Sequence, residues 1–171
     1  QVRFTNLDGK SYSTSFQTEL SFEPLQKLNI RLAYRYFDVK TTYGQELLDK
    51  PFTAKHRAFA NLGYEVKDWK FDYTVSFNSA KRIPSTAGNP EQYQLPAKSP
   101  SYTVMNAQVS KTVGKKYPVD IYIGGENLTN FFQQNAVLAA DAPFSNYFDA
   151  SLVWGPVGGR MIYGGLRFKI K

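Results

Sequence analysis

Residues 11–23 read SYSTSFQTELSFE, and two kinds of side chain alternate along this run without interruption. The even positions, from Tyr12 to Phe22, are aromatic, aliphatic or β-branched, whereas the odd positions, from Ser11 to Glu23, are all polar. A β-strand places successive side chains on opposite faces of a sheet. The run therefore predicts a strand with one apolar face and one polar face.

The same alternation recurs along the rest of the chain, and the 3.6-residue period of an amphipathic helix is nearly absent. It predicts six further strands, over residues 28–40, 56–66, 69–79, 101–113, 119–127 and 160–171. An eighth strand is an open alternative at residues 147–154. The predicted fold class is all-β, with antiparallel strands.

The connections between the predicted strands alternate strictly between short and long. The short ones are residues 24–27, 67–68 and 114–118, and the long ones are residues 41–55, 80–100 and 128–159. This asymmetry is typical of a transmembrane β-barrel, which has short periplasmic turns and long extracellular loops. A soluble sheet that binds a carbohydrate or a protein is the less favoured reading.

Aromatic residues on the apolar faces gather near both ends of the strands. Those at the short-turn end are Phe22, Tyr64, Trp69, Tyr117 and Phe168, and those toward the long loops are Tyr12, Tyr34, Tyr36 and Phe77. Amphipathic rings concentrate at the two membrane–water interfaces. We therefore expect the outer membrane of a Gram-negative bacterium, with extracellular long loops and a periplasmic C-terminus.

The composition of the 171 residues argues against several classes of function. The chain has no cysteine, which excludes disulfides, thiolate zinc sites and thiol catalysis, and it has a single histidine, His56. The sequence predicts no catalytic residues, no metal site and no cofactor, so we expect no enzyme. The net charge is +7, but the basic residues are spread along the chain, and we expect no nucleic-acid partner.

Seven strands do not close as an up-and-down barrel of the usual even-strand kind. We therefore expect residues 1–171 to form the C-terminal segment of a larger barrel of roughly 22 strands, whose other strands and plug lie upstream. The alternative is a free-standing eight-stranded outer-membrane barrel with a structural or adhesion role. Charged residues are expected on the face that lines the lumen: Glu19, Arg31, Arg35, Arg57, Asp72 and Glu126. They would contact the plug or substrate path, or form ion pairs across strands.

Two motifs resemble those of TonB-dependent receptors. Residues 123–130, IGGENLTN, are similar to the family's G-x-E-N-L-T/F-N/D motif, carried here by Glu126, Asn127, Leu128, Thr129 and Asn130. Residues 159–170, GRMIYGGLRFKI, look like the family's last strand. Residues 5–20 match a third motif less well, because Gln17 replaces a glycine. The pattern looks closest to receptors of the bacteroidete type.

The resemblance implies TonB-dependent active uptake of a scarce nutrient such as a ferric siderophore, haem, cobalamin, another metal chelate or a glycan. This segment would supply barrel wall and ligand-capture loops. The implied partners are the plug domain and remaining strands of the same receptor, and TonB–ExbB–ExbD acting through a TonB box in the N-terminal part. Others are the barrel-assembly machinery, outer-membrane lipid, lipopolysaccharide and a surface lipoprotein.

Aromatic and charged residues in the long loops are the candidates for ligand binding, because such side chains anchor chelates and sugars. They are Tyr43, Glu46, Arg82, Tyr93, Phe131, Phe132, Phe144 and Tyr147. The alternative is that they pack the loops against one another. Phe168 and Ile170 are the candidate C-terminal signal for barrel assembly, although Phe168 also fits a simple interfacial role.

Overall fold

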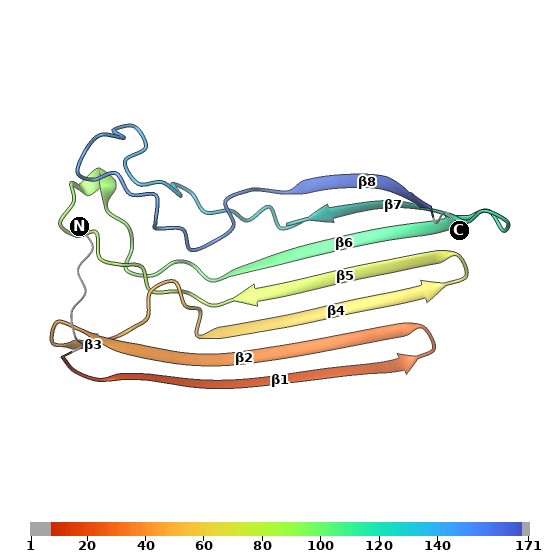
Figure 1. Cartoon of the computed structure of the whole chain (residues 1–171), viewed down its shortest axis with the longest axis horizontal. Helices are drawn as coiled ribbons and strands as arrows, with labels where there is room; N and C mark the ends of the chain where they lie inside the picture. The colour runs from red at the N-terminus through yellow and green to blue at the C-terminus, as the bar shows by residue number, and fades with distance from the viewer. Residues whose placement is uncertain (1–7, 169–171) are drawn as a thin grey trace.

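The computed structural model describes residues 8–168 of the chain. They form one antiparallel sheet in which the long strands lie side by side in sequence order, and one short strand pairs only with the strand before it (Figure 1). The strands are β1 (Ser11–Leu25), β2 (Leu28–Tyr43), β3 (Glu46–Asp49), β4 (His56–Val66), β5 (Trp69–Asn78), β6 (Tyr102–Val113), β7 (Val119–Glu126) and β8 (Met161–Phe168). A single turn of 3-10 helix, η1 (Glu91–Tyr93), interrupts the loop between β5 and β6.

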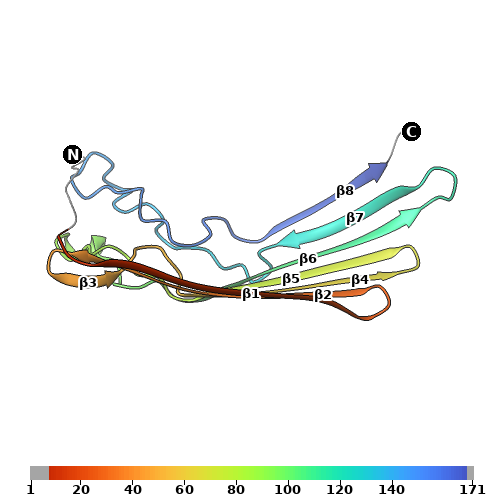
Figure 2. The same ribbon diagram turned by 60° about the horizontal axis from the view of Figure 1, so that its bottom comes forward.

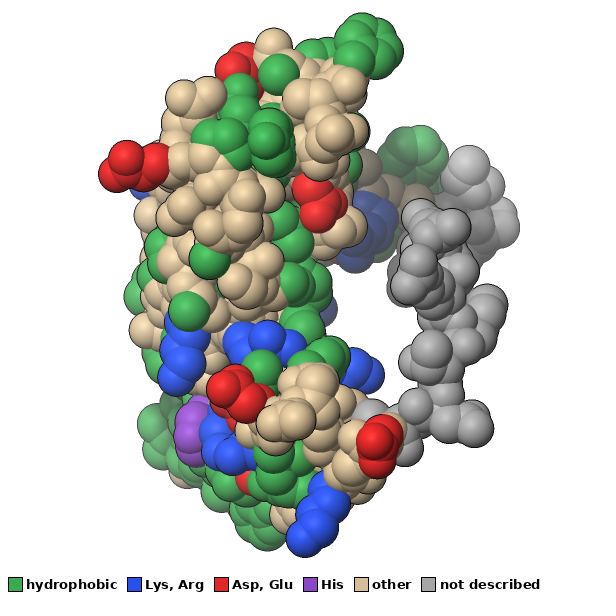
Figure 3. Space-filling view, turned by 90° about the vertical axis from the view of Figure 1, so that its left-hand side faces the viewer, with side chains coloured by type: hydrophobic (Ala, Val, Ile, Leu, Met, Phe, Trp, Pro, Cys, Tyr) green, Lys and Arg blue, Asp and Glu red, His purple; other side chains and the backbone are tan. Residues whose placement is uncertain are grey.

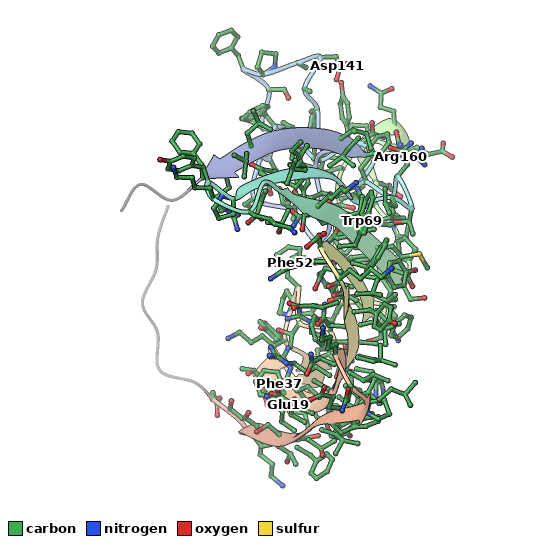
Figure 4. All side chains as sticks on the ribbon, turned by 90° about the vertical axis from the view of Figure 1, so that its right-hand side faces the viewer. Glu19, Phe37, Phe52, Trp69, Asp141 and Arg160 are labelled. Carbon is green, nitrogen blue, oxygen red and sulfur yellow. The ribbon has the colours of Figure 1, made fainter. Side chains whose placement is uncertain are left out.

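The register keeps the two kinds of side chain on separate faces across the whole sheet. Leu20 in β1 is opposite Leu32 in β2, which is opposite Ala60 in β4. The sheet is curved, with Glu19 and Phe37 on its concave side (Figure 4). The polar residues of the alternation thus share the concave face, where Phe37 also lies, and the apolar residues share the convex face, which confirms the strand prediction.

The apolar face has no protein partner among the described residues. Phe16 is 58% exposed and Leu166 67% exposed. In the described part of the chain the buried apolar side chains all belong to the long loops: Ala54, Ile83, Leu138, Ala139 and Leu152. A soluble sandwich would bury its apolar sheet face, whereas residues 8–168 leave this face uncovered. An exposed apolar surface of this extent suits contact with lipid.

The two ends of the sheet differ as the spacing of the strands predicts. Tight connections close one end, and Lys27, Lys67 and Gly114 adopt positive φ angles of 68°, 53° and 88° there. The long connections lie together at the other end (Figures 1 and 2). Within the described residues, no helix is long and apolar enough to cross a membrane, a finding that concerns helices alone.

The structure corrects the position of the eighth strand. Residues 147–154 form no strand, and their pairing is limited to a single bridge between Leu138 and Asp149. The side chain of Asp149 accepts hydrogen bonds from the backbone N–H and the hydroxyl of Ser151, a local turn that competes with an extended ladder. The eighth strand is instead β3, which pairs with the outer end of β2 through a hairpin at Gly44, φ 64°.

The sheet is open, because β1 and β8 occupy its two edges and do not pair with each other. Figure 2 shows the two edge strands well apart on a curved strip. Each edge therefore presents backbone groups along one side of a strand, without a partner in the part of the chain that the structure describes.

Candidate functional site

Asn127, the asparagine of the E-N-L-T-N motif, organises the outer end of β7. Its side chain is 7% exposed and its φ is 49°, a left-handed conformation that asparagine tolerates better than most residues. Its Nδ2 donates to the carbonyls of Phe131 (2.7 Å) and Gly158 (3.0 Å), and its Oδ1 accepts from the backbone N–H of Phe131 (3.2 Å). One side chain thus ties together the two ends of the 128–159 loop.

The other motif residues extend this junction to the neighbouring strands. Thr129 donates to the carbonyl of Thr103, 2.8 Å away, and Asn130 Oδ1 accepts from the backbone N–H of Arg160 at 2.9 Å. Arg160 in turn donates to the carbonyl of Leu128 (2.8 Å). The motif therefore acts as a structural turn that joins β6, β7 and β8. Glu126 stands exposed on the polar face beside it.

A first loop-end cluster forms where loops 41–55 and 80–100 meet. The guanidinium of Arg82 lies over the ring of Tyr43, with 4.8 Å from Cζ to the ring centroid, and its Nε donates to the carbonyl of Asp49 (2.5 Å). Glu46 is opposite Tyr43 in the β2–β3 hairpin. Three of the predicted ligand residues are thus neighbours, although they are separated by up to 39 positions.

A second cluster is aromatic and lies between loops 80–100 and 128–159. The rings of Tyr102 and Phe131 are stacked, with centroids 4.8 Å apart and an angle of 5° between their planes, and Trp154 lies 6.1 Å from Phe131. Lys81 Nζ donates to the hydroxyl of Tyr102 (3.1 Å) and to the carbonyl of Trp154. Of this set only Phe131 is among the predicted ligand residues.

The buried side chain of Gln133 fixes the backbone around Trp154 and so supports this aromatic cluster. It is 4% exposed, and its Oε1 accepts from the backbone N–H of Trp154 (2.7 Å) and of Gly155 (3.2 Å) while its Nε2 donates to the carbonyl of Leu152 (2.9 Å). The sequence does not reveal that Trp154 belongs to the site. The only signal is that it is the single tryptophan in a long loop.

The remaining predicted loop residues are more dispersed. Tyr93 donates to a carboxylate oxygen of Asp141 (2.9 Å), and its ring lies 6.0 Å from that of Tyr147, beside a hollow of about 330 Å³. Phe132 is partly exposed, and Phe144 projects fully into solvent without joining a cluster. Figure 3, a view onto the loop end, shows Lys and Arg side chains gathered around its middle.

The concave face carries most of the predicted lumen-facing charges. Arg31 and Glu19 form an ion pair (3.7 Å), and Asp72 accepts from the Nδ2 of Asn61 (3.1 Å). Arg35 and Arg57 lie opposite each other on β2 and β4. Phe168 is exposed on the convex face of β8, and Ile170 lies outside the described residues.

Asp38 and Lys55 form an ion pair on the convex face, next to Tyr36 on the side of the long loops. Lys55 Nζ lies 2.9 Å from Asp38 Oδ1. The contact with this carboxylate raises the pKa of Lys55, which lies in the loop before β4.

The described residues contain no group of three His, Cys, Asp or Glu side chains placed to hold a metal ion. What the loop end offers is a set of exposed and half-buried rings with Arg and Lys side chains beside them. Such groups can bind a ligand through stacking, cation–π contacts and hydrogen bonds.

Two solved structures of known proteins are similar to this sheet. The solved structure of the siderophore receptor PiuA from Acinetobacter baumannii is similar to it with a TM-score of 0.61 and 19% identity, over 92% of this chain and 22% of that one. The unliganded ferric citrate transporter FecA gives a TM-score of 0.57 and 14% identity, over 82% of this chain and 21% of that one. The chain therefore spans about a fifth of the length of either structure, and the likeness concerns the fold.

A search of curated proteins finds no match. The family model described as "TonB dependent receptor-like, beta-barrel" matches residues 1–128, well over half of the sequence. The chain belongs to the TonB-dependent receptor family, in the part that forms the β-barrel.

Proposed function

We propose that this chain is the C-terminal part of the barrel of a TonB-dependent transporter in the outer membrane of a Gram-negative bacterium. The observation that carries the proposal is the open sheet with an exposed apolar face. A sheet edge in lipid leaves backbone N–H and C=O groups without partners, which costs several kcal/mol per group. Further strands must therefore cover β1 and β8 before the convex face can contact lipid.

The similar solved structures support this proposal, because each is several times longer than the chain and the chain matches a fifth of it. The free-standing eight-stranded barrel is less well supported. Among the strands that residues 8–168 form, β3 has four residues, is too short to cross the apolar band and pairs with β2 alone, which leaves seven. The apolar band is the part of the convex face between the two groups of aromatic residues. Members of the family are transporters rather than enzymes, and active nutrient uptake is the function proposed here.

In this proposal the loop end captures the cargo outside the cell. The Arg82–Tyr43 contact and the Lys81–Tyr102–Phe131–Trp154 cluster offer aromatic and cationic groups at the mouth of the concave face. The concave face would then line the path inward beside a plug domain, with TonB–ExbB–ExbD as the source of energy. The C-terminus would lie in the periplasm.

The size and behaviour of the native polypeptide test the proposal. We expect a polypeptide several times heavier than 19.4 kDa when outer membranes are extracted in detergent and probed with an antibody against residues 128–159. Cells that carry it should take up a ferric chelate in a manner that a protonophore or loss of TonB abolishes. A native mass near 19.4 kDa would refute the proposal and favour the small free-standing barrel.

A further inference from the structure

A tryptophan and a lysine lie together on the convex face at its short-turn end. Trp69, the first residue of β5, is the direct partner of Lys111 in β6, and Lys111 Nζ lies 5.0 Å from the centroid of the Trp69 ring. The same ring stacks against that of Phe71, with centroids 6.2 Å apart and an angle of 14° between the planes. This cation–π contact keeps the ammonium group at the edge of the apolar band.

Two more lysines lie in the turns beside this pair. The turns after β4 and β6 are at the same end of the sheet (Figure 1), and the carbonyl of Asp68 accepts a hydrogen bond from the backbone N–H of Thr112 at 2.8 Å. The first turn carries Lys67. The second carries Lys116, whose Nζ lies 5.5 Å from the centroid of the ring of Tyr117. We call Lys67, Lys111 and Lys116 the rim lysines.

The charge of the rim lysines is not balanced within the part of the chain that the structure describes. Across residues 8–168, no carboxylate lies within ion-pair distance of any of the three. Lys70, the neighbour of Trp69 on the concave face, is paired with Glu65 at 3.2 Å. At the other end of the convex face, Lys55 is paired with Asp38 at 2.9 Å. The short-turn end of the convex face therefore calls for an anionic partner.

The level of these side chains in the membrane identifies that partner. Amphipathic rings such as that of Trp69 lie at the membrane–water interface, beside the lipid head groups. A lysine at this level lays its methylene chain along apolar surface and extends its ammonium group toward the head groups. Anionic head groups attract such a lysine, and each lysine near the surface strengthens binding about fivefold. In the proposed orientation this end faces the periplasm, so the leaflet is the inner one.

We propose that the rim lysines and the ring of Trp69 form a docking surface for the head group of an anionic phospholipid in the inner leaflet of the outer membrane. A zwitterionic head group carries an ammonium group of its own, which competes with the lysines for the phosphate. The surface therefore selects a head group with a net negative charge. This inference rests on the proposed function, which sets the orientation, and it adds which lipid the barrel wall selects and where.

The test uses the full-length receptor that carries this segment, reconstituted in phosphatidylethanolamine vesicles. Brominated phosphatidylglycerol or brominated phosphatidylethanolamine is added as a quencher, and the fluorescence of Trp69 is the difference between the wild type and Trp69→Phe. We expect Trp69 to show at least about a fivefold preference for phosphatidylglycerol. Salt at about 1 M should remove this preference in the unaltered protein, because it screens exposed charges.

Substitutions assign the preference to the rim lysines. Lys111→Gln and Lys116→Gln should each lower it about fivefold. Lys70→Gln is the matched control, because it removes a lysine that is next to Trp69 in sequence but paired with Glu65 on the other face. It should change the preference less than twofold. All three variants should keep the thermal midpoint of the wild type.

Three results would overturn the inference: equal quenching of Trp69 by the two brominated lipids, a preference that persists in high salt, or Gln variants at the rim that keep the wild-type preference. Purified peptidoglycan, whose stem peptides carry carboxylates, is the other anionic partner to test. If it binds the receptor through the rim lysines while the lipid preference is absent, the lipid assignment is wrong. Failure of the proposed function is separate, since it is a native mass near 19.4 kDa or uptake that does not need TonB.

Discussion

Substitution of Asn127 by alanine should loosen the loop end without unfolding the barrel. The change removes the three hydrogen bonds that its side chain makes with the backbone of Phe131 and Gly158. At about 1 kcal/mol for each bond, the loss is about 3 kcal/mol. Alanine at a φ of 49° adds about 1 kcal/mol of backbone strain, for a total of about 4 kcal/mol.

Hydrogen exchange followed by mass spectrometry measures this change where it occurs. A decrease of about 4 kcal/mol in the free energy of local opening raises exchange of amides limited by that opening roughly 1,000-fold. The effect should appear in peptides that cover residues 127–134 and 152–160. Asn127→Gly keeps the loss of hydrogen bonds but relieves the strain, so its increase should be roughly 150-fold.

Asn146→Ala is the matched control, since Asn146 lies exposed in the same loop. It should leave exchange in both regions unchanged. An increase below tenfold for Asn127→Ala, or one equal in size across β1 and β2, would refute the assignment of Asn127 as the residue that joins the two loop ends.

Three further predictions follow from the sheet and its outer rim. Gly165→Ala should destabilise the barrel by about 1–3 kcal/mol, because the new Cβ would lie 2.6 Å from Cζ of the tyrosine ring opposite, and urea unfolding in lipid vesicles would measure the loss. Leu32→Arg should cost about 2–4 kcal/mol in the same assay, because the side chain faces the middle of the apolar band. Lys55 has a raised pKa, so the stability that it contributes is present below its ordinary pKa and is lost as the pH rises through the higher folded value; nitrogen-15 NMR of its ammonium group would show the high midpoint, which Asp38→Asn should lower.

Each of these predictions has a control and a contrary result. For Gly165 the control is Gly88→Ala, where an added Cβ meets nothing within 4 Å, and equal effects of the two changes would contradict the steric argument. For Leu32 the control is Thr74→Arg on the concave face. Similar losses of stability for the two variants would contradict the claim that the convex face contacts lipid and the concave face does not. For Lys55, a midpoint at the ordinary value in the wild type would contradict the ion pair with Asp38.

The strands were predictable from sequence because each lies between two different surroundings. Alternation such as that of residues 11–23 is needed wherever one face meets lipid and the other meets polar groups. Beyond the apolar band this requirement ends. The four residues of β3 show no alternation, and the segment at residues 147–154, which does look apolar, is held in an irregular path by Gln133 and Asp149.

The candidate site was harder to predict from the sequence, because its contacts join residues that are far apart in the chain. Tyr43 and Arg82 can be named as single residues from their chemistry, but their contact depends on how two loops cross. Lys81 and Trp154 are 73 positions apart, and nothing local in the sequence relates them. The opposition of Arg35 and Arg57 likewise requires the register of β2 and β4. The ligand-binding roles of the loop residues stay predictions.

Within residues 8–168, the buried apolar side chains, from Ala54 to Leu152, all belong to the loops and none to the sheet. The protein therefore has two sources of cohesion: the membrane for its strands, and a small core of its own for its loops. The loop end can keep its shape when detergent or heat loosens the barrel wall. If the loops capture the cargo, as proposed, substitutions there can alter which ligand is bound without disturbing any strand register. Ligand selectivity and membrane anchoring would then be able to change separately.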